Sequence, residues 1–246
     1  MDFHKQSRFR FRFDWGMNGV LNLAPVSDVV IIVDVLSFST AVDIALSRGA
    51  IVYPCENRDE KAAELARLKG AFLAVPRKDM TSDSPYSLSP ESLTRLPNGS
   101  SLVLPSLNGA TLTLEAVKHC KNVITGCLRN ASSIAHKAES IGPVVSVIAA
   151  GERWNDENNS LRPALEDIFG AGAILTEFGE RSLSPESTGA VGLYEKLKFD
   201  PEMYLLDSVS GRELVKTGFR SDVEIASQLN VSKCVPVFTD NYFTCD

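Results

Sequence analysis

The sequence has few of the residues on which common hydrolase and metal-binding motifs depend. It has three histidines, five scattered cysteines and no CxxC pair, so a structural zinc site is not expected. No cysteine is followed by five residues and then an arginine, and RHG and GxSxG are absent. These absences exclude a cysteine phosphatase, a phosphohistidine enzyme and a nucleophile elbow. Leu36, not a second aspartate, stands two positions after Asp34, which excludes a haloacid-dehalogenase phosphatase.

Long apolar runs are also missing. None approaches the ~20 residues that cross a bilayer, and the first residues lack the apolar core of a signal peptide. The cysteines are odd in number, so we expect free thiols in a reducing cytoplasm rather than a disulfide framework. The net charge of −6 argues against nucleic acid or an anionic membrane as a partner.

The stretch Asp28–Ala50 (DVVIIVDVLSFSTAVDIALSRGA) has the strongest pattern in the chain. Val29–Val33 is an unbroken β-branched run, typical of a strand buried on both faces of a largely parallel sheet. Small hydroxylated residues then lead into a helical pattern, where they can cap the helix and leave N–H groups for an anion. Asp34 follows the strand, at the edge where open α/β sheets bind ligands, so we interpret it as a site residue. The alternative is that Asp34 only caps a turn.

At Ser101 the order of strand, turn, helix and strand begins again. An offset of about 71 residues aligns three pairs: Leu36 with Leu107, Thr40 with Thr111, and Ala45 with Ala116. This short match indicates an internal duplication in an α/β fold. It would place Asp34 and Asn108 near equivalent strand ends, on one edge of the sheet.

Four polar loops follow predicted strands: DVLSFST, SLNGAT, GCLRNASS and AAGERW. They supply a carboxylate, amides, hydroxyls and guanidinium groups from Asp34, Asn108, Asn130, Ser37, Ser39, Thr40, Arg129 and Arg153. Carboxylate and amide oxygens suit Mg²⁺, and free amides with arginines suit phosphate oxygens. The four loops together therefore favour a site for Mg²⁺ and phosphate oxygens.

Two further acidic residues, Glu166 and Asp167, lie in the first turn of a helix predicted over residues 164–178. Either could be a metal ligand, although acidic residues here also offset the helix macrodipole. Neighbours on a helix point about 100° apart, so at most one faces a given metal. Glu152 and Asp156 compete with them for this role.

These motifs resemble those of the 2-phosphosulfolactate phosphatase family. DVLSFSTAVDIALSRGA, PSLNGATL, GCLRNAS and AAGERW…SLRPALEDIFGAGAIL occur there in this order and spacing, and the resemblance runs from about Phe11 to Phe238. It implies a three-layer α/β/α fold with a mostly parallel or mixed sheet. We expect one domain over residues 1–246, either undivided or as two intertwined halves of about 1–100 and 101–246.

The resemblance also implies an activity, Mg²⁺-dependent hydrolysis of (R)-2-phospho-3-sulfolactate to 3-sulfolactate and phosphate in coenzyme M biosynthesis. By motif, the candidates for metal and phosphate binding are Asp34, Ser39, Asn108, Asn130, Glu166 and Asp167. Asp34 would hold the metal or act as nucleophile. Loop N–H groups, that of Gly109 among them, would hold phosphoryl oxygens with Asn108 and Asn130. The alternative is a non-catalytic anion-binding protein on the same fold. An exposed apolar helix face would favour a homodimer.

The chain departs from the family pattern at two arginine positions, which are Ser37 and Thr111 here. Arg77 is retained, at the root of a Ser/Pro-rich segment over residues 79–100 that is long enough to form a lid. We therefore predict that Arg77 contacts the ligand and that the preferred phosphoester is less highly charged than 2-phosphosulfolactate. The alternative is that another arginine restores the charge, from among Arg10, Arg12, Arg129 and Arg153.

Overall fold

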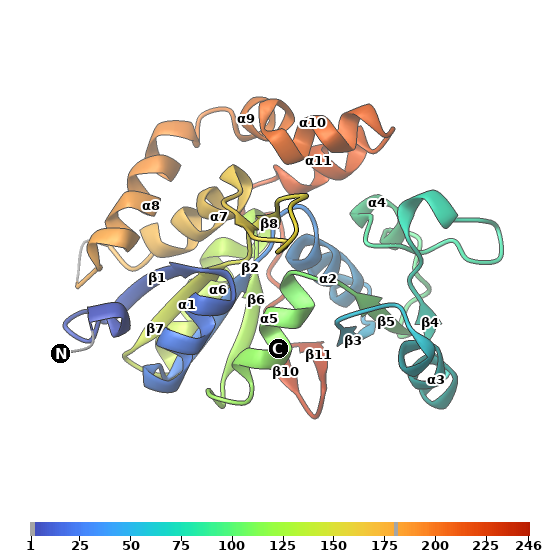
Figure 1. The fold of residues 1–246 in the computed structure, drawn as a ribbon, viewed down its shortest axis with the longest axis horizontal. Coiled ribbons are helices and arrows are strands. Elements are labelled where there is room, and N and C mark those ends of the chain that lie inside the picture. Colours follow the sequence, from blue (N-terminus) through green and yellow to red (C-terminus); the bar gives the residue numbers. More distant parts are fainter. Residues whose placement is uncertain (1–2, 180–181) are drawn as a thin grey trace.

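The computed structural model describes residues 3–179 and 182–246 and has one large mixed sheet with helices on both faces (Figure 1). The sheet order is β1-β7-β2-β6-β10-β11-β3-β5-β4, and β8 and β9 form a separate hairpin. The strands are β1 (Phe11–Trp15), β2 (Val29–Val33), β3 (Ile51–Cys55), β4 (Phe72–Leu73), β5 (Ser101–Pro105), β6 (Val123–Gly126), β7 (Val145–Ala149), β8 (Glu152–Arg153), β9 (Leu161–Arg162), β10 (Pro236–Thr239) and β11 (Tyr242–Cys245).

The helices fall into a set that packs on the sheet and a C-terminal set. In Figure 1, α9, α10 and α11 lie above the β8–β9 hairpin. The helices are α1 (Gly16–Leu23), α2 (Phe38–Ser47), α3 (Glu60–Lys69), α4 (Pro90–Leu93), α5 (Gly109–Ala116), α6 (Ala131–Ile141), α7 (Leu165–Thr176), α8 (Pro185–Leu197), α9 (Pro201–Asp207), α10 (Val209–Lys216) and α11 (Arg220–Ala226). None of the helices in the described ranges is long and apolar enough to traverse a bilayer.

Strand β2 is buried on both faces, and its side chains divide between two cores. Val29, Ile31 and Val33 pack with α6, α7 and α8. The alternate residues Val30 and Ile32 pack with α1 and α5. This period-2 division of an all-apolar strand is what a sheet covered by helices on both faces requires. It confirms the predicted three-layer α/β/α fold.

The two predicted strand–helix–strand units are present, as β2–α2–β3 and β5–α5–β6. The first strand of each unit pairs in parallel with the last strand of the other, β2 with β6 and β5 with β3. The hairpin β10–β11 then fills the space between β6 and β3 with antiparallel pairs. The helix starts also correspond, because Thr40 donates to the carbonyl of Val35 and Thr111 to that of Ser106, five residues back in each case.

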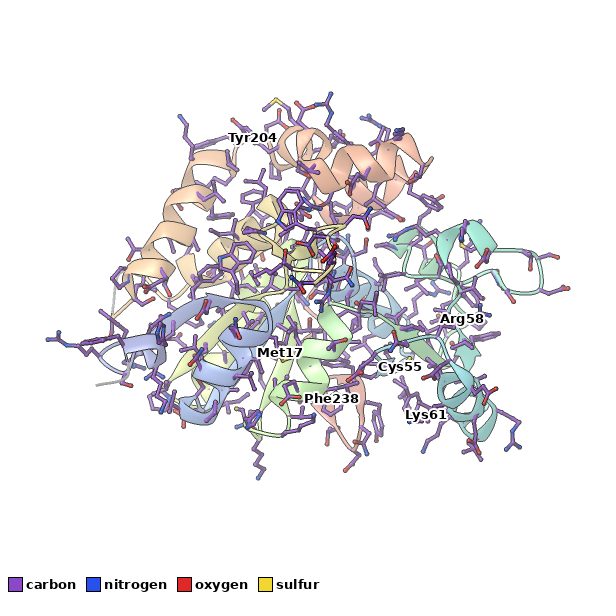
Figure 2. All side chains as sticks on the ribbon, viewed as in Figure 1. Met17, Cys55, Arg58, Lys61, Tyr204 and Phe238 are labelled. Carbon is purple, nitrogen blue, oxygen red and sulfur yellow. A yellow bond between two sulfur atoms is a disulfide. The ribbon has the colours of Figure 1, made fainter. Side chains whose placement is uncertain are left out.

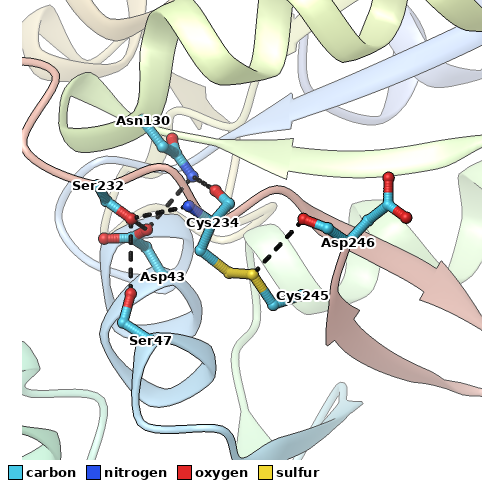
Figure 3. The surroundings of a disulfide bond; sticks show 7 residues. All are labelled: Asp43, Ser47, Asn130, Ser232, Cys234, Cys245 and Asp246. Carbon is cyan, nitrogen blue, oxygen red and sulfur yellow. Dashed lines mark hydrogen bonds between the residues drawn. A yellow bond between two sulfur atoms is a disulfide. The ribbon is translucent and has the colours of Figure 1, made fainter.

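Three local expectations are wrong. The apolar periodicity of the sequence predicts helices over Ala41–Arg48 and Leu112–His119, but α2 and α5 begin earlier, at Phe38 and Gly109, because their first turns contain Ser, Thr and Gly. The expectation of free thiols fails for Cys234 and Cys245, which form a disulfide (Figure 3). The β10–β11 hairpin brings them together across the strands that it pairs.

Helix α7, which carries Glu166 and Asp167, packs closely on α8 through a glycine. A Cβ at Gly172 would collide with the main-chain oxygen of Ala190 and approach Cβ of Tyr194 at 2.8 Å. Gly192, within α8, would meet nothing within 4 Å. The packing of α7 on α8 therefore requires glycine at position 172, whereas no contact requires glycine at position 192.

We expect Gly172→Ala to lower the free energy of unfolding by about 1–3 kcal/mol, because α8 must move away to accommodate the methyl group. Gly192→Ala is the matched control and should raise it by about 0.5–1 kcal/mol through helix propensity. Urea titrations of both variants measure the difference. Equal effects of the two substitutions would contradict the packing argument.

Candidate functional site

Asp34 follows β2 and joins the starts of two helices. Its Oδ1 accepts a hydrogen bond from N–H of Phe38 at the start of α2 (3.0 Å), and its Oδ2 accepts one from N–H of Gly109 at the start of α5 (2.9 Å). The turn-capping interpretation is therefore correct in part, but the same carboxylate also holds the second repeat. Gly109 must be glycine because a Cβ there would overlap the ring of Phe38.

Asp167, at the start of α7, plays a similar part for two other loops. Its Oδ1 accepts from N–H of Val35 (2.8 Å) and its Oδ2 from N–H of Gly151 (2.7 Å). Glu166 lies towards α10 and interacts with Ser210 and Arg162. The neighbouring carboxylates thus contact different groups, as the helical geometry predicts.

Glu152 completes a group of four acidic side chains at this edge of the sheet. It lies on β8, just after β7, and accepts a hydrogen bond from Nδ2 of Asn108 at 3.0 Å. Burial, together with the nearby Asp34 carboxylate, raises the pKa of Glu152 to about 7. Burial likewise raises the pKa of Asp34 to about 6, although the N–H groups of Phe38 and Gly109 oppose this.

The other two carboxyl groups share this environment. The pKa of Asp167 lies well above its usual range because of burial and because Asp34 and Glu166 are near. The pKa of Glu166 is also raised, mainly by burial, while Arg162 opposes the shift. The four groups therefore repel one another in a poorly solvated place. A cation at this position would relieve that repulsion.

Two cavities meet at Glu152, and we name each after one lining residue. The Arg77 cavity, about 390 Å³, is lined by Arg77, Lys78, Ser210 and Glu213 among others. The Asn108 cavity, about 420 Å³, is lined by Asn108, Thr111, Arg153 and Glu56 among others. Glu152 lines both. In Figure 2, Cys55 and Arg58, which flank Glu56 and Asn57 in the chain, lie on the side that carries β3, β4 and β5.

Arg77 connects the start of α2 to the C-terminal helices. Its Nη2 donates to Oγ of Ser37 (2.7 Å), and its Nε donates to the buried carboxylate of Asp222 on α11 (3.1 Å). Asp222 also accepts from N–H of Glu91, at the start of α4 in the 79–100 segment. A guanidinium group thus stands beside Ser37, where the family pattern has arginine. Arg77 is not among the arginines that the sequence analysis expected to restore the missing charge, which were Arg10, Arg12, Arg129 and Arg153.

Arg129 and Asn130 lie in a separate network on Asp43 of α2. Nε of Arg129 donates to Asp43 at 2.8 Å, and its Nη1 donates to the carbonyl of Ile225 (3.2 Å) and to Gln228. Nδ2 of Asn130 donates to the carbonyl of Cys234 and to Asp43, beside the disulfide (Figure 3). Asn130 stands at the N-cap position of α6, but its Oδ1 accepts from N–H of Cys127 and its side chain makes no capping hydrogen bond to that helix.

The hydroxyls of Ser39 and Thr40 are fully buried and hold the backbone of the first loop. Oγ of Ser39 accepts from N–H of Asp34 and bonds Oγ1 of Thr125, while Thr40 donates to the carbonyl of Val35. Of the remaining candidates, Arg153 lines the Asn108 cavity. Asp156 is exposed at the hairpin end and bonds Ser160, away from the four carboxylates.

Three residues of this site follow no strand, so reasoning from strand ends could not find them. Ser210 and Asp222 come from α10 and α11, and Arg162 comes from β9. Arg162 donates to Ser210 at 3.2 Å and lies 5.9 Å from the ring centroid of Trp154. The sequence signal for Ser210 and Asp222 was the polar, charged character of the tail segment SGRELVKTGFRSDV, and Arg162 lies in the quoted family motif SLRPALED.

The donor set fits a hard cation in its chemistry. Carboxylates and an amide are the oxygen ligands that Mg²⁺ takes. In residues 3–179 and 182–246, no three His, Cys, Asp or Glu side chains are placed to hold one metal ion. Mg²⁺ commonly uses only one or two protein carboxylates, with water and substrate phosphate completing its coordination. Occupation by Mg²⁺ stays a prediction.

Comparison with known proteins assigns the chain to a family. The family model described as 2-phosphosulpholactate phosphatase matches residues 20–241. The chain belongs to the 2-phosphosulfolactate phosphatase family. The recognition made from the motifs is thereby confirmed.

Members of the family from distant bacteria align over most of their length. A probable 2-phosphosulfolactate phosphatase of Carboxydothermus hydrogenoformans is 30% identical over 216 residues, which are 84% of this chain and 84% of that protein. Proteins with the same name from Deinococcus radiodurans and Thermotoga maritima are 26% and 25% identical, over 85% and 90% of this chain and 87% and 95% of theirs. The family resemblance thus includes both intertwined units and the C-terminal helices.

Glu152 makes stability depend on pH. Its pKa in the fold, about 7, lies above its ordinary value of 4.5, so the folded state keeps a proton that the unfolded chain loses. The contribution of Glu152 to stability is therefore present below about pH 4.5 and is lost as the pH rises through about 7. We expect Glu152→Gln to raise the free energy of unfolding by about 1–2 kcal/mol near pH 8, and to change it little near pH 4.

Urea titrations at both pH values, without divalent cations, measure this effect. Gln keeps an acceptor for Asn108, so the substitution removes mainly the charge. The exposed Glu64→Gln on α3 is the matched control. A gain of the same size in both variants would show that the four clustered carboxylates do not repel one another.

Proposed function

We propose that the protein is a Mg²⁺-dependent phosphatase that hydrolyses a small phosphoester of the 2-phosphosulfolactate type to an alcohol and phosphate. The observation that supports this most is the group of four acidic side chains where two cavities meet, of which Asp34, Glu166 and Asp167 are buried and Glu152 is half-buried. Family membership supports the reaction class. The non-catalytic alternative would not require carboxyl groups with raised pKa values where two cavities meet.

The residues of the Arg77 cavity suit the phosphoryl group. Arg77 and Lys78 supply positive charge, and Ser210 supplies a hydroxyl. Charge-assisted hydrogen bonds from a guanidinium group are the strong ones for phosphate oxygens. Because Asp222 and Ser37 fix the Arg77 side chain, little side-chain entropy remains to be lost when a phosphate binds.

Asp34, with Glu166 or Asp167, would hold Mg²⁺, since each carboxylate oxygen that accepts one N–H bond keeps a second lone pair. When bound, the ion would neutralise phosphate charge and make water more acidic. Glu152 lines both cavities, so its carboxyl group would lie next to the ester oxygen of a ligand that spans them. With a pKa of about 7, its carboxyl group can hold a proton at neutral pH and give it to the departing alcohol.

Phosphate release from 2-phosphosulfolactate, with Mg²⁺ and with a chelator, tests the proposal directly. We expect release only with the ion, and a loss of at least about a thousandfold in kcat for Asp34→Asn, because the substitution removes the charge that the reaction needs. The exposed Asp83→Asn in the 79–100 segment is the control and should keep full activity.

Acid quenching of the same reaction separates the two roles left open for Asp34. A nucleophilic carboxylate forms an acyl phosphate, which an acid quench and mass spectrometry can locate on Asp34. A metal-binding carboxylate forms none. Turnover in Asp34→Glu without a phosphorylated enzyme would exclude the nucleophile.

Arg77→Ala should raise KM about 10- to 100-fold, because a charge-assisted contact to the phosphoester is lost. The KM of Arg95→Ala, an exposed arginine in the same segment, should stay unchanged. Steady-state kinetics at saturating Mg²⁺ measure both. Wild-type KM in Arg77→Ala would mean that this arginine only connects α2 to α11.

A further inference from the structure

The two cavities that meet at Glu152 differ in charge. The Asn108 cavity contains two carboxylates, Glu56 and Glu152, but a single guanidinium group, that of Arg153. Arg153 is already held by main-chain carbonyls, from Nη1 to Asn159 (3.3 Å) and from Nη2 to Leu107 (3.4 Å). This space therefore offers no uncommitted cation to a ligand that brings a further carboxylate or sulfonate into it.

The remaining polar groups of the Asn108 cavity are neutral. Three asparagines and a threonine line it, namely Asn57, Asn108, Asn159 and Thr111. An amide and a hydroxyl each have a hydrogen-bond donor and an acceptor, so they can hydrogen-bond to each other without any net charge. This lining is suited to a ligand with alcohol groups.

We propose that the Asn108 cavity is the subsite for the alcohol part of the substrate and that it selects a neutral, hydroxylated tail. The inference rests on the proposed phosphatase function, with the phosphoryl group on the Arg77 side of Glu152. A volume of about 420 Å³ accommodates a tail of a few carbons. The preferred substrate is then a polyol monophosphate rather than a phosphoester with two further anionic groups.

Thr111 is the residue of this cavity that decides the selection. It lies in the first turn of α5, and its Oγ1 donates to the carbonyl of Ser106 at 3.3 Å, so its side chain is fixed at the cavity wall. An arginine at this position would supply a cationic partner for an anionic tail. Thr111 is thus a specificity-determining residue.

Three phosphoesters with the same three-carbon skeleton test this. Glycerol 2-phosphate has no further anionic group, 2-phosphoglycerate has one carboxylate, and 2-phosphosulfolactate has a carboxylate and a sulfonate. We expect kcat/KM of the wild type to fall about tenfold with each added anionic group. Thr111→Arg should reduce or reverse this order, gaining about tenfold on the anionic substrates.

Thr188→Arg is the matched control. Thr188 is an exposed threonine in the first turn of α8 whose hydroxyl also donates to a main-chain carbonyl, that of Ser184. It should keep the wild-type order. The shift of Tm with each phosphoester gives the order of binding independently of turnover.

The outcomes separate the two proposals. If Tm shifts follow the expected order and respond to Thr111→Arg while no phosphate is released, the subsite stands and the phosphatase proposal fails. If phosphate is released but 2-phosphosulfolactate is preferred, or Thr111→Arg changes nothing, the subsite is overturned and the phosphatase stands. Absence of any Tm shift with all three ligands also overturns the subsite.

Discussion

The Asp34 carboxylate is the point through which the two strand–helix–strand units depend on each other. One oxygen accepts from the first turn of α2 and the other from the start of α5, so the starts of two helices are fixed relative to one strand end. Helix N-termini favour negative charge, which helps to hold a carboxylate that is almost fully buried. Because β2 pairs with β6 and β5 with β3, each unit completes the sheet of the other. The site is therefore built from both units at once.

Placing four carboxyl groups at this edge has an energetic cost, and their raised pKa values express it. Desolvation and mutual repulsion act in the same direction, and hydrogen bonds from nearby N–H groups and the positive charges of Arg77 and Arg162 oppose them. A fold selected for stability alone would avoid such an arrangement, whereas a site that binds a divalent cation requires it. The close placement of the four carboxyl groups thus accounts both for their energetic cost and for the proposed chemistry.

The C-terminal helices supply polar and charged side chains to the site that the strand ends do not provide. Ser210 and Glu213 of α10 line the Arg77 cavity, and Asp222 of α11 fixes the guanidinium that reaches Ser37. By contrast, Arg129 and Asn130, which follow β6 and looked equivalent to the other loop residues, face Asp43 and the disulfide strand. Position after a strand therefore brings Asp34 and Asn108 to this site, but it does not decide which way a side chain points.

The sequence by itself determined the α/β class, the buried strand β2, the repeated unit and the placement of Asp34 and Asn108 at one edge, because these follow from local periodicity and from the rule that parallel strands end together. It also determined the family, since motifs are local. Only the tertiary structure decided that Glu152 joins the two cavities, that Asp222 holds Arg77, and that Cys234 meets Cys245. These contacts link residues far apart in the chain or on opposite sides of a turn. Side-chain direction there is set by packing between elements, which no periodicity in the sequence records.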